Sequence, residues 1–137
     1  MVKEIGISVV IPAYNEQENV ELVYKKLKPI LDKLKKRYEI IFVDDGSTDE
    51  TFFRIKHLHR NDSRVKGIQL QKNFGKSAAY MAGFEIATGS IIVTIDADLQ
   101  DEPEELPRLL EALKYYDLVI GWKYLRRDNF SKRIASM

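Results

Sequence analysis

Five short apolar runs alternate with longer amphipathic segments along the chain. The runs are rich in β-branched residues and are bounded by Asp, Gly or Pro, which is typical of strands buried on both faces of a parallel sheet. They span residues 5–11, 38–43, 65–70, 90–95 and 117–121. The segments between them repeat apolar residues every three or four positions, as amphipathic helices do. These predicted helices span residues 16–36, 48–59, 77–87 and 103–114.

This alternation of strand and helix predicts an α/β fold. Right-handed crossovers join parallel strands, so we expect a Rossmann-like, doubly wound and mostly parallel sheet with helices on both faces. In such sheets, ligands bind outside the carboxyl ends of the strands. Polar residues should therefore gather in the loops that directly follow the strands.

Polar loops do follow four of the five predicted strands. They are PAYNE (12–16), DDGSTD (44–49), DADLQD (96–101) and GWKY (121–124). One acidic loop would be unremarkable, but three acidic loops on one sheet edge are hard to explain by structural roles alone. The sequence therefore predicts a ligand site at this edge.

The DADLQD loop places two carboxylates, Asp96 and Asp98, two residues apart at the end of a strand. Carboxylates this close repel each other unless a cation is present. Mg²⁺ or Mn²⁺ would take them as oxygen ligands, with the Gln100 carbonyl as a further neutral donor, and would keep phosphate oxygens and water. The alternative is that acidic residues serve the positive start of the following helix, which is the better explanation for Asp101 and Glu102.

Two further loops carry groups suited to a nucleotide. Asp44 and Asp45 close the second strand, where a carboxylate commonly accepts hydrogen bonds from a ribose. Lys72 and Lys76 flank a glycine turn that opens a helix and could approach an anion, although a solvated lysine on a plain loop is the alternative. The sequence contains neither GxGxxG after the first strand nor a P-loop. A metal and basic side chains would therefore have to hold the phosphates.

Composition narrows the class of protein. A chain of 137 residues is about one domain in size, and 45% apolar with 31% charged residues is typical of a soluble globular protein. A net charge of +1 provides no overall field, so we expect no nucleic-acid partner. The absence of cysteine excludes disulfides and thiolate metal sites. No apolar run approaches the roughly 20 residues of a membrane span, so we expect a cytoplasmic location.

Several motifs together resemble a known family. VVIPAYNE, VDDGSTD and IDADLQD, in this order and spacing, resemble the family 2 glycosyltransferases, which have a GT-A fold. NFGKSAAYMAGFEIATG, DADLQDEPEELP and GWKYLRRDNFSKRIAS are similar to the polyprenyl-phosphate glycosyltransferases, the group of dolichyl-phosphate mannose synthase and bactoprenol glucosyltransferase. The resemblance extends from Ile7 to Ser136.

The resemblance also implies roles for individual residues. Asp96 and Asp98 would be the catalytic pair that, with Gln100, holds Mg²⁺ or Mn²⁺ on the diphosphate of a UDP- or GDP-sugar. The residues implied to bind the nucleotide are Pro12, Ala13, Tyr14, Glu16, Val43, Asp45, Lys76, Ala97 and Lys123. Lys123 stands where the group usually has arginine, and lysine lacks the bidentate fork of arginine, so Arg126 or Arg127 could take over its role.

The function implied is metal-dependent, inverting transfer of a sugar from a nucleoside-diphosphate sugar to a polyprenyl (dolichyl or undecaprenyl) phosphate. A sugar or protein hydroxyl acceptor is one alternative, and a non-catalytic nucleotide-sugar-binding module is another. We expect residues 1–121 to form the donor-binding core. We expect the basic residues 122–137 to lead into an acceptor-binding region beyond this chain, which would place the full-length protein at the cytoplasmic face of a membrane.

Overall fold

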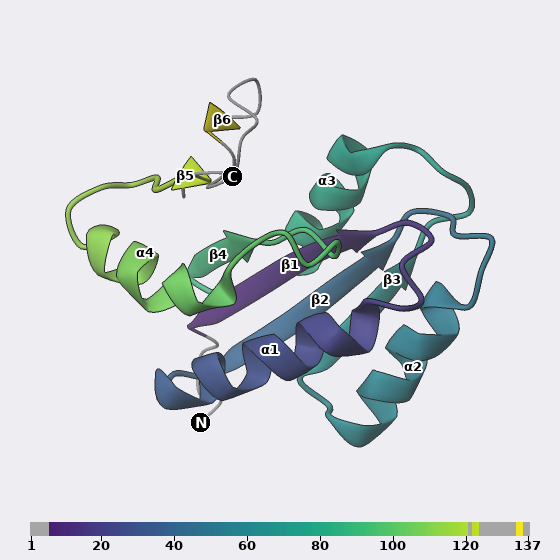
Figure 1. Cartoon of the computed structure of the whole chain (residues 1–137), viewed down its shortest axis with the longest axis horizontal. Coiled ribbons are helices and arrows are strands. Elements are labelled where there is room, and N and C mark those ends of the chain that lie inside the picture. The colour runs from purple at the N-terminus through teal and green to yellow at the C-terminus, as the bar shows by residue number, and fades with distance from the viewer. Residues whose placement is uncertain (1–5, 121, 124–133, 136–137) are drawn as a thin grey trace, which may run out of the picture.

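The computed structural model describes residues 6–120 and, by backbone only, residues 122–123 and 134–135 (Figure 1). The strands are β1 (Ile7–Ala13), β2 (Tyr38–Asp44), β3 (Val65–Gln69), β4 (Ile91–Thr94), β5 (Trp122–Lys123) and β6 (Ile134–Ala135). The helices are α1 (Val20–Lys33), α2 (Thr51–Asn61), α3 (Lys76–Ile86), the short 3₁₀ helix η1 (Pro103–Glu105) and α4 (Leu106–Ala112).

The first four strands form one parallel sheet in the order β3-β2-β1-β4. In the register, Ile7 of β1 lies opposite Tyr38 of β2 on one side and Ile91 of β4 on the other. Every residue of β1 and β2 is buried, as expected for central strands covered on both faces. The predicted parallel α/β sheet is therefore confirmed for its first four strands.

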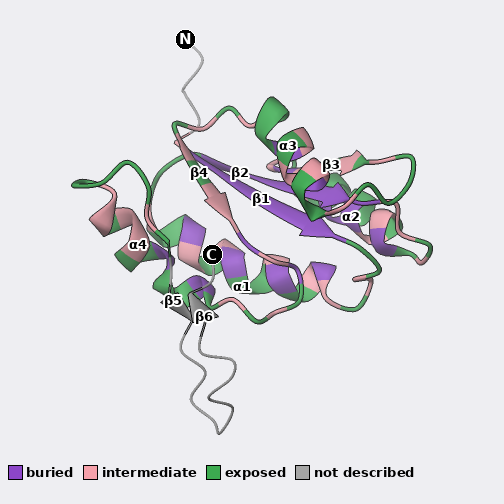
Figure 2. Cartoon of the chain, turned by 90° about the horizontal axis from the view of Figure 1, so that it is seen from above, coloured by how far each residue is buried: buried purple, intermediate pink, exposed green. Residues whose placement is uncertain are grey.

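Helices cover both faces of this sheet, as the sequence predicted. Helices α1 and α2 pack on one face in a cluster that includes Leu27, Phe42 and Ile55, whereas α3 packs on the other against Val10 and Val43 (Figure 2). A Cβ atom at Gly83 of α3 would lie 2.4 Å from a Val10 methyl group, closer than packing allows. Glycine at this position therefore lets α3 approach the sheet.

The prediction of a fifth strand over residues 117–121 is wrong for the residues of that run that the structure describes. Residues 117–120 form no strand, and residue 121 lies outside the described residues. β5 starts at Trp122 and pairs antiparallel with β6 in a separate two-stranded sheet. The Leu118 and Ile120 side chains are 75% and 49% exposed. An apolar run forms a strand only where a neighbouring strand supplies hydrogen-bond partners, and no described strand does so here.

A buried carboxylate joins three strands at the amino-terminal end of the sheet. Glu39 of β2 accepts hydrogen bonds from the Ser8 hydroxyl of β1, from the Lys66 ammonium group of β3, and from the backbone N–H and hydroxyl of Thr88. Burial by itself would raise the pKa of Glu39, but the hydrogen bonds from Lys66, Ser8 and Thr88 outweigh it and hold this pKa below its usual value. The ionised carboxylate therefore stabilises the fold.

We expect Glu39→Gln to lower the free energy of unfolding by about 2 kcal/mol at pH 7, because the variant loses charged hydrogen bonds in a buried position. The native pKa is lowered, so the contribution of Glu39 is present above its unfolded pKa of about 4.3 and is lost as the pH falls through the native value. The difference between the two proteins should therefore shrink in acid. Urea unfolding followed by circular dichroism at pH 7 and below pH 4 measures this difference.

Glu105→Gln is the matched control, because the Glu105 side chain is 50% exposed and pairs only with the exposed Arg108 among the described residues. It should change stability by less than about 0.5 kcal/mol. Equal stability of Glu39→Gln and the wild-type chain at pH 7 would contradict a stabilising role for the Glu39 network.

Candidate functional site

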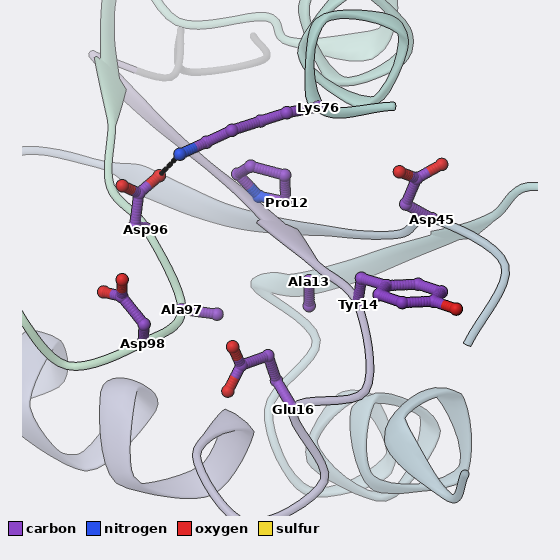
Figure 3. A pocket seen from close by; sticks show the side chains of 9 residues that line it. All are labelled: Pro12, Ala13, Tyr14, Glu16, Asp45, Lys76, Asp96, Ala97 and Asp98. Carbon is purple, nitrogen blue, oxygen red and sulfur yellow. Dashed lines mark ion pairs between the residues drawn. The ribbon is translucent and has the colours of Figure 1, made fainter. Parts of the chain in front are cut away.

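A cleft of about 180 Å³ lies at the carboxyl-terminal edge of the sheet (Figure 3). Three loops and the start of α3 line it, as the parallel topology requires. The lining residues are Pro12, Ala13, Tyr14, Glu16, Asp45, Lys76, Asp96, Ala97 and Asp98. The structure therefore brings together all the predicted site residues except Val43, Gln100 and Lys123.

Asp96, which follows β4, is held by two side chains of α3 and by one residue of its own loop. Its Oδ1 atom lies 2.6 Å from the Nζ atom of Lys76 and accepts a hydrogen bond of 3.1 Å from the Tyr80 hydroxyl (Figure 3 shows the lysine contact). Its backbone N–H donates to Asp101 Oδ2 over 2.7 Å. Asp101 therefore closes the loop that carries Asp96, a role that the sequence did not suggest.

Asp98 lies beyond Ala97, with its carboxylate on the same side of the cleft as that of Asp96 (Figure 3). Its Oδ1 atom accepts a hydrogen bond of 3.1 Å from the backbone N–H of Gln100. Leu99 between them has a positive φ of 64°, which turns the chain back on itself. The turn leaves Asp98 on the cleft, while Gln100 is exposed and lies outside the cleft lining.

Asp45 is buried to 4% exposure and holds the entrance to α3. Its two carboxylate oxygens accept hydrogen bonds from the backbone N–H groups of Phe74, over 2.8 Å, and Gly75, over 3.0 Å. Gly75 has a φ of 102°, a conformation that favours glycine. The neighbouring Gly46 leaves no room for a side chain, because its Cβ would lie 2.3 Å from the Lys72 carbonyl carbon. Asp45 and Gly46 thus hold the loop that follows β2 in close contact with the loop that precedes α3.

Of the other predicted residues, Val43 lies outside the cleft, and the side chain of Lys123 lies outside the described residues. The Val43 side chain is fully buried in the cluster between the sheet and α3, so it lies under the site instead of in the cleft. The backbone of Lys123 belongs to β5, but its side chain lies outside the described residues, as does most of the basic segment 122–137.

Tyr80 is a site residue that sequence reasoning missed. It follows Lys76 by one helical turn in α3, so both side chains can reach Asp96 from the same face of the helix. That i,i+4 spacing was the available signal. Burial raises the pKa of the Tyr80 hydroxyl above its usual value, and the negative charge of Asp96 raises it further. The hydroxyl therefore stays protonated and can act as a donor to Asp96.

The donor set of the cleft suits a hard divalent cation that is shared with an anionic ligand. Among the described residues, no group of three or more His, Cys, Asp or Glu side chains could hold a metal ion. Asp96 and Asp98 alone would supply two oxygen ligands. Mg²⁺ and Mn²⁺ are commonly bound by one or two carboxylates and complete their shells with phosphate oxygens and water, so the residues present fit such an ion.

Solved structures with this fold contain nucleotides and manganese. The chain is similar to glucosyl-3-phosphoglycerate synthase from Mycobacterium tuberculosis, solved in complex with Mn²⁺, UDP and phosphoglyceric acid. The TM-score is 0.64 at 29% identity, over 85% of this chain and 41% of that one. It is also similar to a mannosyltransferase from Pyrobaculum calidifontis in complex with GDP-Man and Mn²⁺, with a TM-score of 0.61 at 26% identity, over 82% and 33% of the two chains.

A curated relative is more similar in sequence. The chain is 41% identical over 132 residues to an undecaprenyl-phosphate 4-deoxy-4-formamido-L-arabinose transferase of Aeromonas hydrophila. The match covers 95% of this chain but 40% of the relative, so the chain spans about two fifths of that protein's length. In the part of the chain that the structure describes, no helix has both the length and the apolar character needed to cross a membrane.

A family model matches nearly the whole chain, which agrees with the parallel fold and with the three polar loops at one sheet edge. The model is that of glycosyl transferase family 2, and it matches residues 8–136. The resemblance seen in the sequence is thereby confirmed, and the chain belongs to glycosyl transferase family 2.

Proposed function

We propose that the chain is the donor-binding part of a metal-dependent, inverting glycosyltransferase that moves a sugar from a nucleoside-diphosphate sugar to a polyprenyl phosphate. The observation that carries the proposal is the placement of Asp96 and Asp98 on one cleft together with Tyr14 and Asp45. The name of the curated relative, a transferase for undecaprenyl phosphate, supports a lipid-phosphate acceptor.

Asp96 and Asp98 would hold Mg²⁺ or Mn²⁺, with Gln100, two residues after Asp98, as a third ligand. When bound, the ion offsets the negative charge that develops on the departing nucleoside diphosphate. The solved complexes of two similar proteins contain Mn²⁺, which supports this assignment of the metal. One complex contains UDP and the other GDP-Man, so a uridine and a guanosine nucleotide both stay candidates for the donor.

The nucleoside would lie on the other side of the cleft. Tyr14 is 44% exposed there and offers an aromatic face for a base. Asp45 keeps lone pairs free on each oxygen after binding the loop before α3, and can accept a ribose or base hydrogen bond. Pro12, Ala13 and Ala97 would form the floor, and Val43 would support it from beneath.

Glu16 and Lys76 complete the proposed nucleotide site. Glu16 lines the cleft and accepts a hydrogen bond of 2.7 Å from the Asn19 side chain, which orients its carboxylate. The Lys76 ammonium group lies at the Asp96 carboxylate, where it can reach an incoming diphosphate. Lys123 would add a second cation from the segment that follows the core.

A lipid phosphate is a suitable acceptor because it is already an anion at neutral pH. Its oxygen can attack the sugar without a protein base to remove a proton. The basic residues 122–137 would lead into the region that binds it, which would place the full-length protein at the cytoplasmic face of a membrane. An acceptor that is not a lipid is the second candidate, because a similar protein was solved with phosphoglyceric acid.

We expect the chain to bind UDP or GDP only in the presence of Mn²⁺ or Mg²⁺, and Asp98→Asn to weaken that binding roughly tenfold or more, because one charged metal ligand is lost. Calorimetric titration of each nucleotide, with and without Mn²⁺, measures both effects. Glu104→Gln is the control, since Glu104 is an exposed carboxylate of the same acidic run. Nucleotide binding that ignores both the metal and Asp98 would remove the basis of the proposed function.

We expect Asp45→Asn to destabilise the loop before α3 by about 1–3 kcal/mol, because an amide nitrogen would face one of two backbone donors and leave it without an acceptor. Amide hydrogen exchange at Phe74 and Gly75 should accelerate, and nucleotide affinity should fall with it. Glu50→Gln, an exposed carboxylate in the loop before α2, is the matched control and should leave both unchanged. Unchanged exchange at Phe74 and Gly75 in Asp45→Asn would show that Asp45 does not hold this loop.

A further inference from the structure

Lys76 and Asp96 form an ion pair across the proposed metal site (Figure 3). The ammonium nitrogen lies 2.6 Å from Oδ1 of Asp96, and the same oxygen accepts the Tyr80 hydroxyl. A divalent cation that uses this oxygen must therefore displace the ammonium group, because two cations cannot share one oxygen at contact distance without strong repulsion.

The structure allows this displacement without a change in the fold. The backbone of Lys76 is fixed at the start of α3, where Asp45 binds the two preceding N–H groups. The lysine side chain is nevertheless 58% exposed, and its flexible four-carbon stem can carry the charge away from Asp96. Tyr80, which stacks on Phe84 with 5.9 Å between ring centroids, can keep orienting the carboxylate.

We propose that Lys76 is an exchangeable counter-ion that couples metal binding to donor binding. It neutralises Asp96, yields that oxygen to the divalent cation, and moves to the diphosphate that arrives with the cation. A metal that binds alone displaces the lysine without giving it a new anionic partner. A metal that binds with a nucleoside diphosphate supplies that partner. This inference rests on the proposed function, and it predicts that metal and nucleotide strengthen each other's binding.

Lys76→Met separates these effects because it should shift two affinities in opposite directions. Binding of Mn²⁺ without nucleotide should become about fivefold tighter, because the ion no longer has to break a partly screened ion pair in order to reach Asp96. Binding of UDP or GDP at saturating Mn²⁺ should become roughly tenfold weaker, because a charge-assisted contact to the diphosphate is lost. Electron paramagnetic resonance of free Mn²⁺ measures the first affinity, and calorimetry measures the second.

Three further variants test the cause. Lys76→Gln removes the charge but keeps a polar side chain, and it should shift both affinities as Lys76→Met does. Lys76→Arg keeps a cation and should leave Mn²⁺ affinity within about twofold of the wild-type value. Lys72→Met removes a lysine from the loop before α3, whose ammonium group lies over the Phe74 ring and, in the part of the chain that the structure describes, forms no ion pair with Asp96. It should change Mn²⁺ affinity by less than about twofold.

The outcomes distinguish this inference from the proposed function. If Lys76→Met and Lys76→Gln bind Mn²⁺ no more tightly than the wild-type chain, or if no protein binds Mn²⁺ measurably, the counter-ion role is wrong. A gain equal to that of Lys72→Met would also overturn it, since general charge removal would explain the result. If the wild-type chain binds Mn²⁺ but neither UDP nor GDP, the donor site itself is wrong, and with it the coupling.

Discussion

The site depends on the parallel pairing of β1 with a strand on each side. The pairing extends to Ala13 opposite Asp44 on one edge and to Val10 opposite Thr94 on the other, so the loops that follow these strands leave the sheet together. Asp96 and Tyr14 lie more than eighty positions apart in the chain but line one cleft as a result. Buried parallel strands are bound by backbone hydrogen bonds and by packing on both faces, which makes this edge a rigid base.

A second set of contacts connects this edge of the sheet to the proposed metal site. Asp45 binds the N–H groups of Phe74 and Gly75, which fixes the start of α3 and so the backbone of Lys76. Lys76 then reaches Asp96 on the neighbouring loop. Backbone hydrogen bonds to a buried carboxylate make the first of these connections, and an exposed ammonium group makes the second. One connection is thus fixed and the other exchangeable.

The two ends of the sheet use carboxylates in opposite ways. At the amino-terminal end, Glu39 is fully buried and accepts hydrogen bonds from Ser8, Lys66 and Thr88, so its oxygens serve the fold. At the carboxyl-terminal end, Asp96 is about one quarter exposed on a cleft and contacts a cation that can leave. The degree of burial and the kind of partner distinguish a structural carboxylate from one suited to a ligand.

Local periodicity and strand topology were enough to predict four strands, the helices on both faces, and the edge at which polar loops meet. Nine of the predicted site residues line the cleft because parallel crossovers return every strand in the same direction. The missing strand over residues 117–120 has a different cause, since an apolar run cannot indicate whether a partner strand lies beside it. The resemblance implied a nucleotide-binding role for Val43, but only the structure shows that its side chain packs between the sheet and α3.

The sequence by itself determined the fold class, the family and the loops that carry the candidate chemistry, because these follow from periodicity and from motifs of contiguous residues. Tertiary structure alone decided that Asp45 binds the loop before α3, that Asp101 closes the Asp96 loop, and that Lys76 and Tyr80 share one oxygen of Asp96. Such contacts join side chains and backbone groups that packing brings within 2.6–3.1 Å of each other, and no pattern along the chain encodes these distances.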